Sequence, residues 1–139
     1  YYDVTRTSRA QIEAGLTVDS TLGSNQDTVF RWGTGFPFLY FDRVKGVCTN
    51  LLEIPLVVQD IALANIKADD EALMIRGAVE MIEQVAAIGG CITLLWHNQY
   101  LPGTLQYRVY EAVLSRAEEL NAWGCSMNQL ETLWRKRLK

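Results

Sequence analysis

The segment Leu51-Leu-Glu-Ile-Pro-Leu-Val-Val-Gln-Asp60 decides the fold, because it is a nearly continuous run of apolar and β-branched residues. Such a run is typical of a strand that is covered on both faces. Pro55 lacks the N–H group that a sheet ladder needs, and it therefore indicates an edge position or a bulge. We expect one buried strand over residues 51–60, and the rest of the chain is interpreted around it.

A second buried strand is predicted at Cys91–Trp96, and the clearest helix of the sequence lies between the two strands. Acidic residues open this helix from Asp69, and Gly89-Gly90 ends it. Its apolar residues recur at helical spacing: Ala72, Ile75, Val79, Ile82 and Ala86. A second amphipathic helix is expected at about Leu105–Asn121. Strands that alternate with helices of this length predict a mainly parallel α/β fold with right-handed crossovers.

The remaining elements are shorter. Ser8-x-x-Gln11 resembles a capping box, and it predicts a short helix that ends near Gly15. The patterns at Leu16–Thr21 and Thr28–Trp32 indicate short strands, the second of which runs into an aromatic loop rich in Gly and Pro. A brief extended piece at Trp123–Cys125 precedes a last helix, whose capping box is Ser126-Met-Asn-Gln129.

Composition limits the possible classes of protein. A chain of 139 residues with 49% apolar and 21% charged residues is ordinary for one globular domain. The formal net charge of −3 argues against a nucleic-acid partner or an anionic membrane, because both attract a basic surface. No apolar run reaches the roughly 18 residues of a membrane-spanning helix, so no transmembrane segment is expected.

The cysteines favour a reducing compartment. Cys48, Cys91 and Cys125 are far apart in the sequence and form no C-x-x-C pair, and the chain has a single histidine. They are therefore expected to be reduced core residues rather than disulfides or zinc ligands. Together with the lack of a visible signal peptide, this favours the cytoplasm. Because the sequence opens on Tyr1-Tyr-Asp rather than Met, we expect the recorded start to be a truncation.

Polar residues at strand ends are the candidates for chemistry, because α/β enzymes build their sites there. His97 follows the strand Cys91–Trp96, and the two-residue period places Leu95 on the same face. Imidazole changes its protonation near neutral pH and suits proton transfer, although a lone histidine is more often structural. Arg31, followed by Gly33 and Gly35, is able to grip a carboxylate. It is equally able to be a surface residue beside a turn.

Three carboxylic acids stand out as well. Asp19 and Asp60 both fall at predicted strand ends, so they are expected to converge as a carboxylate pair, unless each caps a turn or a helix. Glu53 lies inside an apolar strand, where it is either the buried partner of a base or a charge at a sheet edge.

Several segments, taken in order, resemble the later blocks of a bacterial branch of the polysaccharide deacetylase superfamily. The segments are Gly15-Leu-Thr-Val-Asp-Ser-Thr-Leu-Gly23, Phe30-Arg-Trp-Gly-Thr-Gly-Phe-Pro-Phe38, Leu52-Glu-Ile-Pro-Leu-Val-Val-Gln-Asp60 and Leu94-Leu-Trp-His-Asn98. The resemblance covers most of the chain and depends on the ordered set. It implies a partial (β/α) barrel of the glycoside hydrolase and deacetylase type, with this chain as the second half of the catalytic domain.

The resemblance also implies an activity, the hydrolysis of acetyl groups from a carbohydrate with a divalent metal such as zinc. The family's metal ligands belong to earlier motifs, so the ligands are expected outside this chain, and the chain alone is expected to be inactive. Arg31 and Gly35 match the motif that orients the catalytic base, although Gly33 replaces its usual Pro. Leu95 and His97 match the motif that supplies an apolar wall and the general acid.

Other positions match the family less well. Asp60 matches the carboxylate that tunes the acid, but no Trp follows it. The remaining expected substrate contacts are Asp19, Trp32 and Asn98. An open half barrel would expose sheet edges, which predicts self-association.

Two non-catalytic alternatives stay open. The first is an α/β module that binds sugar through the flat faces of Trp32, Phe36, Trp96 and Tyr100. The second is a small open-sheet protein that binds a protein partner through its sheet edge and aromatic loop.

Overall fold

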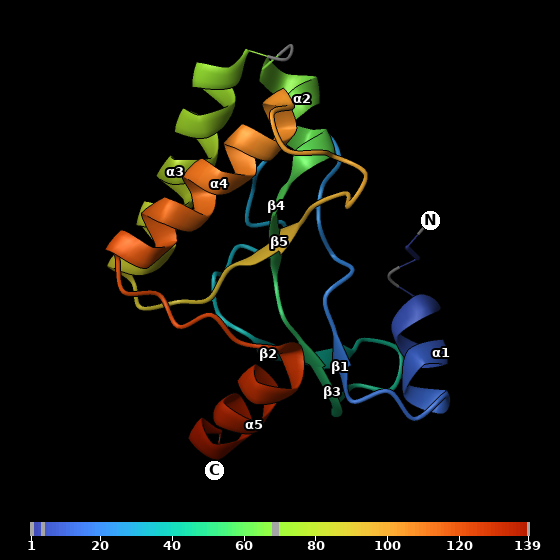
Figure 1. Ribbon diagram of the computed structural model, residues 1–139. Helices are drawn as coiled ribbons and strands as arrows, with labels where there is room; N and C mark the ends of the chain where they lie inside the picture. The colour runs from blue at the N-terminus through green and yellow to red at the C-terminus, as the bar shows by residue number, and fades with distance from the viewer. Residues whose placement is uncertain (1, 4, 68–69, 139) are drawn as a thin grey trace.

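The computed structural model describes residues 2, 3, 5–67 and 70–138, which form a mixed α/β fold (Figure 1). In chain order the elements are α1 (Thr7–Glu13), β1 (Val18–Asp19), β2 (Phe38–Asp42), β3 (Val47–Glu53), β4 (Leu56–Gln59), α2 (Asp60–Lys67), α3 (Glu71–Ala87), β5 (Thr93–Leu95), α4 (Leu105–Glu119) and α5 (Met127–Arg137). The expected α/β class is confirmed at this level.

The strands of the described residues form two small sheets and no closed barrel. One sheet has the order β1-β3-β2, in which β3 is parallel to β1 and antiparallel to β2. The other pairs β4 with β5 in parallel. Near the junction of the sheets the Thr93 hydroxyl donates to the Pro55 carbonyl oxygen, and the Ser20 hydroxyl lies 3.3 Å from the Thr93 hydroxyl. The end of β1 is therefore tied to the start of β5.

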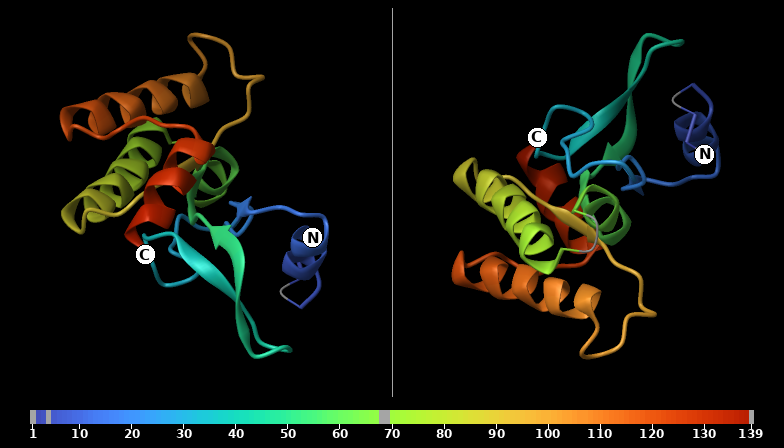
Figure 2. Two further views of the ribbon diagram at one scale, coloured as in Figure 1. Left: turned by 90° about the horizontal axis from the view of Figure 1, so that it is seen from below. Right: turned by 90° about the horizontal axis from the view of Figure 1, so that it is seen from above.

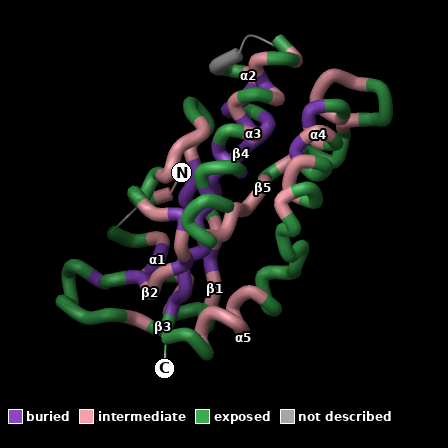
Figure 3. The backbone as a smooth tube through the Cα atoms, turned by 90° about the vertical axis from the view of Figure 1, so that its left-hand side faces the viewer, coloured by how far each residue is buried: buried purple, intermediate pink, exposed green. Residues whose placement is uncertain are grey.

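The main core lies between β4 and the helices α2, α3 and α4. Its buried members are Val57, Val58, Leu63, Met74, Ala78, Met81, Ile82, Val109 and Val113. The views in Figure 2 show α3 and α4 side by side, as their mutual contacts require. Figure 3 shows buried residues following the chain through β3 and β4, so this segment is covered as its apolar sequence predicts.

Capping residues explain where the larger helices begin. The Asp70 side chain accepts a hydrogen bond of 3.0 Å from the Leu73 N–H at the start of α3. Asp69, where this helix was expected to open, lies outside the described residues. At α5 the predicted capping box of Ser126 and Gln129 is formed. Because Gly89 follows α3 with φ of 64°, the predicted stop is confirmed too.

The helix α5 is fastened to the three-stranded sheet by Arg135. Its guanidinium donates hydrogen bonds of 2.8 Å to the carbonyl oxygens of Thr17 and Asn50 and to the Asn50 side chain. Glu131 holds the same guanidinium at 2.9 Å. These contacts place α5 beside the start of β1 and the middle of β3.

The predicted strands differ from the observed ones in three places. The expected strand over 51–60 is divided by Pro55 into β3 and β4, with a register shift opposite β5, and Asp60 already belongs to α2. Residues 28–32 form turns instead of a strand, because Arg31 and Gly33 donate N–H bonds to Val29 and Phe30. The aromatic segment after them, expected as a loop, contains β2.

Two further expectations need correction near the amino terminus. Ser8 and Gln11 do not cap α1, whose N-cap is Arg6 without a side-chain bond. Ser8 is instead buried, and its hydroxyl contacts the Tyr2 hydroxyl. The strand expected over 16–21 shortens to Val18–Asp19. No helix of the described residues is both long and apolar enough to cross a membrane.

Candidate functional site

Asp60 and His97 meet at the carboxyl ends of β4 and β5. The parallel register pairs Gln59 with Leu95, so the residues that follow each strand come to the same sheet end. His97 Nδ1 lies 2.7 Å from Asp60 Oδ2 and 3.0 Å from Oδ1, and the His97 backbone N–H donates to Oδ2 at 2.8 Å. The ring is therefore held to the carboxylate both by its own nitrogen and by its backbone.

Asp60 accepts hydrogen bonds at the amino-terminal end of α2. The residue is 1% exposed and opens α2, whose N-terminal N–H groups carry partial positive charge. Its Oδ1 accepts the Ile61 N–H at 2.7 Å. Because both carboxyl oxygens of Asp60 accept backbone N–H groups, we assign the proton of this contact to His97 Nδ1, and Nε2 is then the nitrogen left for exchange. Asp60 thus fixes both the tautomer and the orientation of the imidazole.

The imidazole itself is accessible. The His97 side chain is 43% exposed, and the edge of the Tyr100 ring approaches it with centroids 6.3 Å apart. Leu95, the last residue of β5, and Asn98 are exposed as well. A fixed imidazole with an open Nε2 is able to donate or accept a proton at a bound ligand.

Arg31 lies in the turn that replaces its predicted strand, and it is exposed. Its guanidinium donates to the Gly23 carbonyl oxygen, so its remaining nitrogens are the ones that a carboxylate could reach. Gly35, the other residue of this motif, is buried and accepts the Cys91 N–H at 2.8 Å. Packing, rather than contact with a ligand, therefore accounts for the glycine at position 35.

Asp19 lies beside Glu53 and not beside Asp60, so the expected pair of Asp19 and Asp60 is not formed. The register of β1 and β3 pairs Asp19 directly with Glu53, and Asp60 follows seven positions later, after β4. Asp19 Oδ2 accepts the Thr21 hydroxyl at 2.7 Å. Burial raises the pKa of Glu53 to about 9, and the Asp19 carboxylate adds to this rise. Glu53 is thus buried on the central strand rather than at a sheet edge, and its neighbour is another acid and not the expected base.

The four aromatic residues suggested as a sugar platform have separate partners. Trp32 packs edge-on against Phe38 with centroids 5.7 Å apart, and Phe36 stacks on Trp134 at 5.9 Å. Trp96 packs against Tyr110, and its indole N–H donates to the Gln106 carbonyl at 3.2 Å. Tyr100 stands beside His97. The four rings are therefore packed against separate partners on different elements.

The residues present do not fit the divalent metal that the resemblance implies. Within residues 2, 3, 5–67 and 70–138, no group of three or more His, Cys, Asp or Glu side chains is placed to hold an ion. The surface hollows beside α5 and beside α1 have linings that contain neither His97 nor Asp60. The acid–base pair therefore stands outside both of these hollows.

Comparisons with known proteins give no further assignment. No protein-family model, curated protein or solved structure matches this chain significantly. The site is consequently defined by its own geometry.

Sequence reasoning identified both members of the pair but missed what holds them. The start of α2 at Asp60 was not predicted, although the Ala62-Leu-Ala64 segment contains good helix formers. The place of Tyr100 beside His97 had no signal in the sequence, because it depends on the path of the loop after β5.

Proposed function

We propose that this chain carries the general-acid part of a carbohydrate deacetylase, with His97 as the acid and Asp60 as its positioning residue. The observation that carries the proposal is the hydrogen bond of 2.7 Å between the buried Asp60 and His97 Nδ1. It joins two residues from separate motifs of the resemblance, in which Asp60 matches the carboxylate that tunes the acid. The substrate class, an acetylated polysaccharide, comes from that resemblance.

In this proposal the protein groups act through proton transfer. Protonated Nε2 of His97 donates to the leaving nitrogen or oxygen as the acyl bond breaks, while Asp60 stabilises the imidazolium through Nδ1. Leu95, exposed at the end of β5, contacts the acetyl methyl group. Arg31, Trp32 and Asn98 are retained as the further proposed contacts, of which Asn98 directly follows the acid, whereas Asp19 is buried beside Glu53 and is not retained.

The proposal assigns no step to a metal on these residues, because the described side chains do not supply a ligand set. The metal and the catalytic base implied by the resemblance would have to come from other residues of a larger protein. A partial (β/α) barrel, with this chain as its second half, is the corresponding fold proposal. It is supported by the parallel pairs β1–β3 and β4–β5.

The test uses the longest reading frame that contains this chain, expressed as one protein and assayed for acetate release from an acetylated oligosaccharide. His97→Gln should lower kcat by about 10²- to 10⁴-fold, since general acid catalysis has this typical size. Asp60→Asn should lower kcat and change its pH profile, because the imidazole loses its fixed tautomer.

Gln99→Ala, a change at an exposed neighbour, serves as the control and should leave kcat within about twofold of wild type. Full activity of His97→Gln would contradict the proposed acid. Metal-dependent acetate release by the 139-residue chain alone would contradict the assignment of the remaining machinery to other residues.

A further inference from the structure

A second pair of acids lies buried beneath α1, at the ends of β1 and β3. Asp19 and Glu53 are directly paired residues of these parallel strands, and they are 7% and 0% exposed. Burial, followed by the nearby Glu53 and Asp19 charges, raises the pKa of the Tyr2 hydroxyl, which also contacts the Ser8 hydroxyl of α1. Ser8 is buried, and α1 contacts β3 (Figure 1).

Among the described residues, the charged groups that act on Glu53 include no cation. Those that act electrostatically on the cluster are Tyr2, Asp19 and Tyr40, all of which are acids. The nearby Arg9 on α1 is bound to Asp42 instead. Asp19 and the Leu22 N–H are the polar groups next to the Glu53 carboxyl, but neither of its oxygens makes a hydrogen bond of ordinary geometry with a described residue. An ionised Glu53 would therefore place a buried negative charge beside the Asp19 carboxyl.

Local opening at Glu53 is expected to involve α1 rather than the sheet. Glu53 ends a strand that pairs with β1 and β2 on its two sides, and its neighbours Leu52 and Ile54 are both 0% exposed. The helix α1 has only seven residues and no side-chain cap, and it is followed by Gly15 with φ of 82°. Short elements with few buried contacts open at low free-energy cost.

We propose that the proton on the Glu53 carboxyl is a latch that keeps α1 and Tyr2 closed over β1 and β3, and that its loss releases α1. This inference goes beyond the proposed deacetylase function, because it concerns a different pair of acids and a different element. Burial and the Asp19 charge raise the pKa of Glu53 to about 9, so the latch is closed at neutral pH and opens in mildly alkaline solution.

Hydrogen exchange followed by mass spectrometry tests the latch on the 139-residue chain, with protection normalised for the intrinsic pH dependence of exchange. The reporter is the set of α1 amides that bond within the helix, including Ala10 to Arg6 at 3.0 Å and Ala14 to Ala10 at 2.9 Å. Their protection should fall at least about tenfold between pH 7 and 10, whereas β3 amides keep theirs. In Glu53→Gln, which cannot ionise, the fall should be absent.

Glu13→Gln removes an exposed carboxylate from the same helix and should behave as wild type. If Glu53→Gln does not fold, Asp19→Asn takes its place, and its α1 should lose less protection between pH 7 and 10, because the closed state tolerates an ionised Glu53 better without the Asp19 charge. Three results would overturn the latch. They are an unchanged α1 up to pH 10, an equal loss of protection in α1 and β3, and a wild-type pH response in Glu53→Gln.

Discussion

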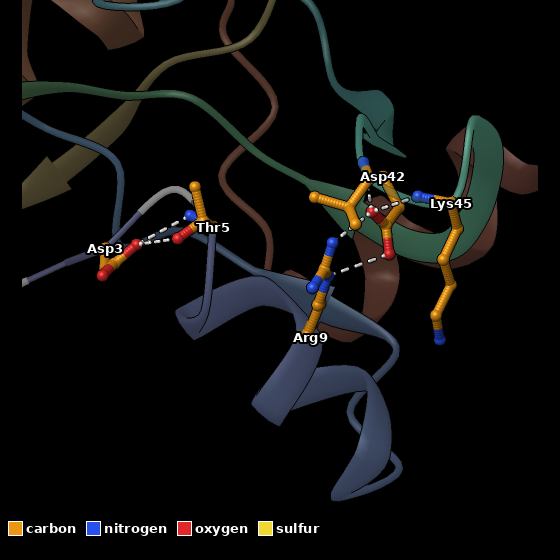
Figure 4. Close-up of polar contacts among 6 residues, drawn as sticks. Asp3, Thr5, Arg9, Asp42 and Lys45 are labelled. Atoms are coloured by element: carbon orange, nitrogen blue, oxygen red, sulfur yellow. Dashed lines mark hydrogen bonds and ion pairs between the residues drawn. The ribbon is translucent and has the colours of Figure 1, made fainter.

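The side chain of Asp42 joins α1 to the β2–β3 turn (Figure 4). Arg9 donates to it through Nε at 3.1 Å and through a terminal nitrogen at 3.0 Å, in a bidentate grip. The N–H groups of Val44 and Lys45 donate to the same carboxylate at 2.9 and 3.0 Å. These bonds, first of all that from Arg9, lower the pKa of Asp42 to about 2. The contact is therefore retained in mildly acidic solution.

This shift predicts a specific loss of stability in acid. Because the pKa of Asp42 is lowered from 3.8 to about 2 by folding, its contribution is present above pH 4 and is lost as pH falls through 2. Urea unfolding at pH 5 and at pH 2.5 should show a smaller acid loss in Asp42→Asn than in wild type. Asp27→Asn, at an exposed turn, is the control. Equal losses in Asp42→Asn and wild type would contradict the prediction.

At the same scale, strand-end positions were a partial guide to the site. Asp60 and His97 meet because the strands before them are neighbours in register. Asp19 also ends a strand, but its strand pairs with β3, so it meets Glu53 instead. Sequence patterns identify strand ends, whereas the pairing of strands depends on contacts between distant segments. The strand patterns alone therefore do not indicate which strand ends lie next to one another.

Among the elements, the passage from α3 into β5 depends on close contact between two glycines. A Cβ atom on Gly90 would lie 2.6 Å from the Gly35 carbonyl oxygen, which is backbone and cannot rotate away. The same oxygen accepts the Cys91 N–H at 2.8 Å. The aromatic segment before β2 is thus held against the end of α3. The glycine pair at 89 and 90, predicted as a helix stop, has this second role in packing.

Gly90→Ala should therefore destabilise the protein by about 1 to 3 kcal/mol, the usual cost of overpacking. Urea unfolding monitored by far-ultraviolet circular dichroism measures the change in the free energy of unfolding. Gly124→Ala is the matched control, since a Cβ there meets no heavy atom within 4 Å, and it should change stability by less than about 1 kcal/mol. Stability unchanged in Gly90→Ala would show that the contact relaxes at no cost.

Helices were more predictable than strands for a physical reason. The apolar stripe of α3 and the capping box of α5 are local signals, and both elements formed where these signals lie. Residues 28–32 have the composition of a strand, but local hydrogen bonds from the Arg31 and Gly33 N–H groups form turns there instead. A strand needs a neighbour to satisfy its backbone, and composition alone does not supply one.

For the whole molecule, the open sheets are the property with the clearest consequence. Among the described strands, β1 and β2 are the two edges of one sheet, and β4 and β5 have one partner each. Exposed apolar side chains accompany these edges, including Phe41 of β2 at 48% exposure. Unpaired strands with apolar side chains are templates for pairing with another chain. In the proposed half barrel, further strands of a larger protein would pair with these edges.

We therefore expect the 139-residue chain to self-associate as its concentration rises from the micromolar to the millimolar range, as followed by sedimentation velocity. Phe41→Lys should shift this association to concentrations several-fold higher, because a lysine on an edge strand discourages pairing. Arg43→Lys, in the neighbouring turn, keeps the charge and should associate as wild type. A chain that stays monomeric throughout the range would count against the half barrel, because its edges would then need no partner.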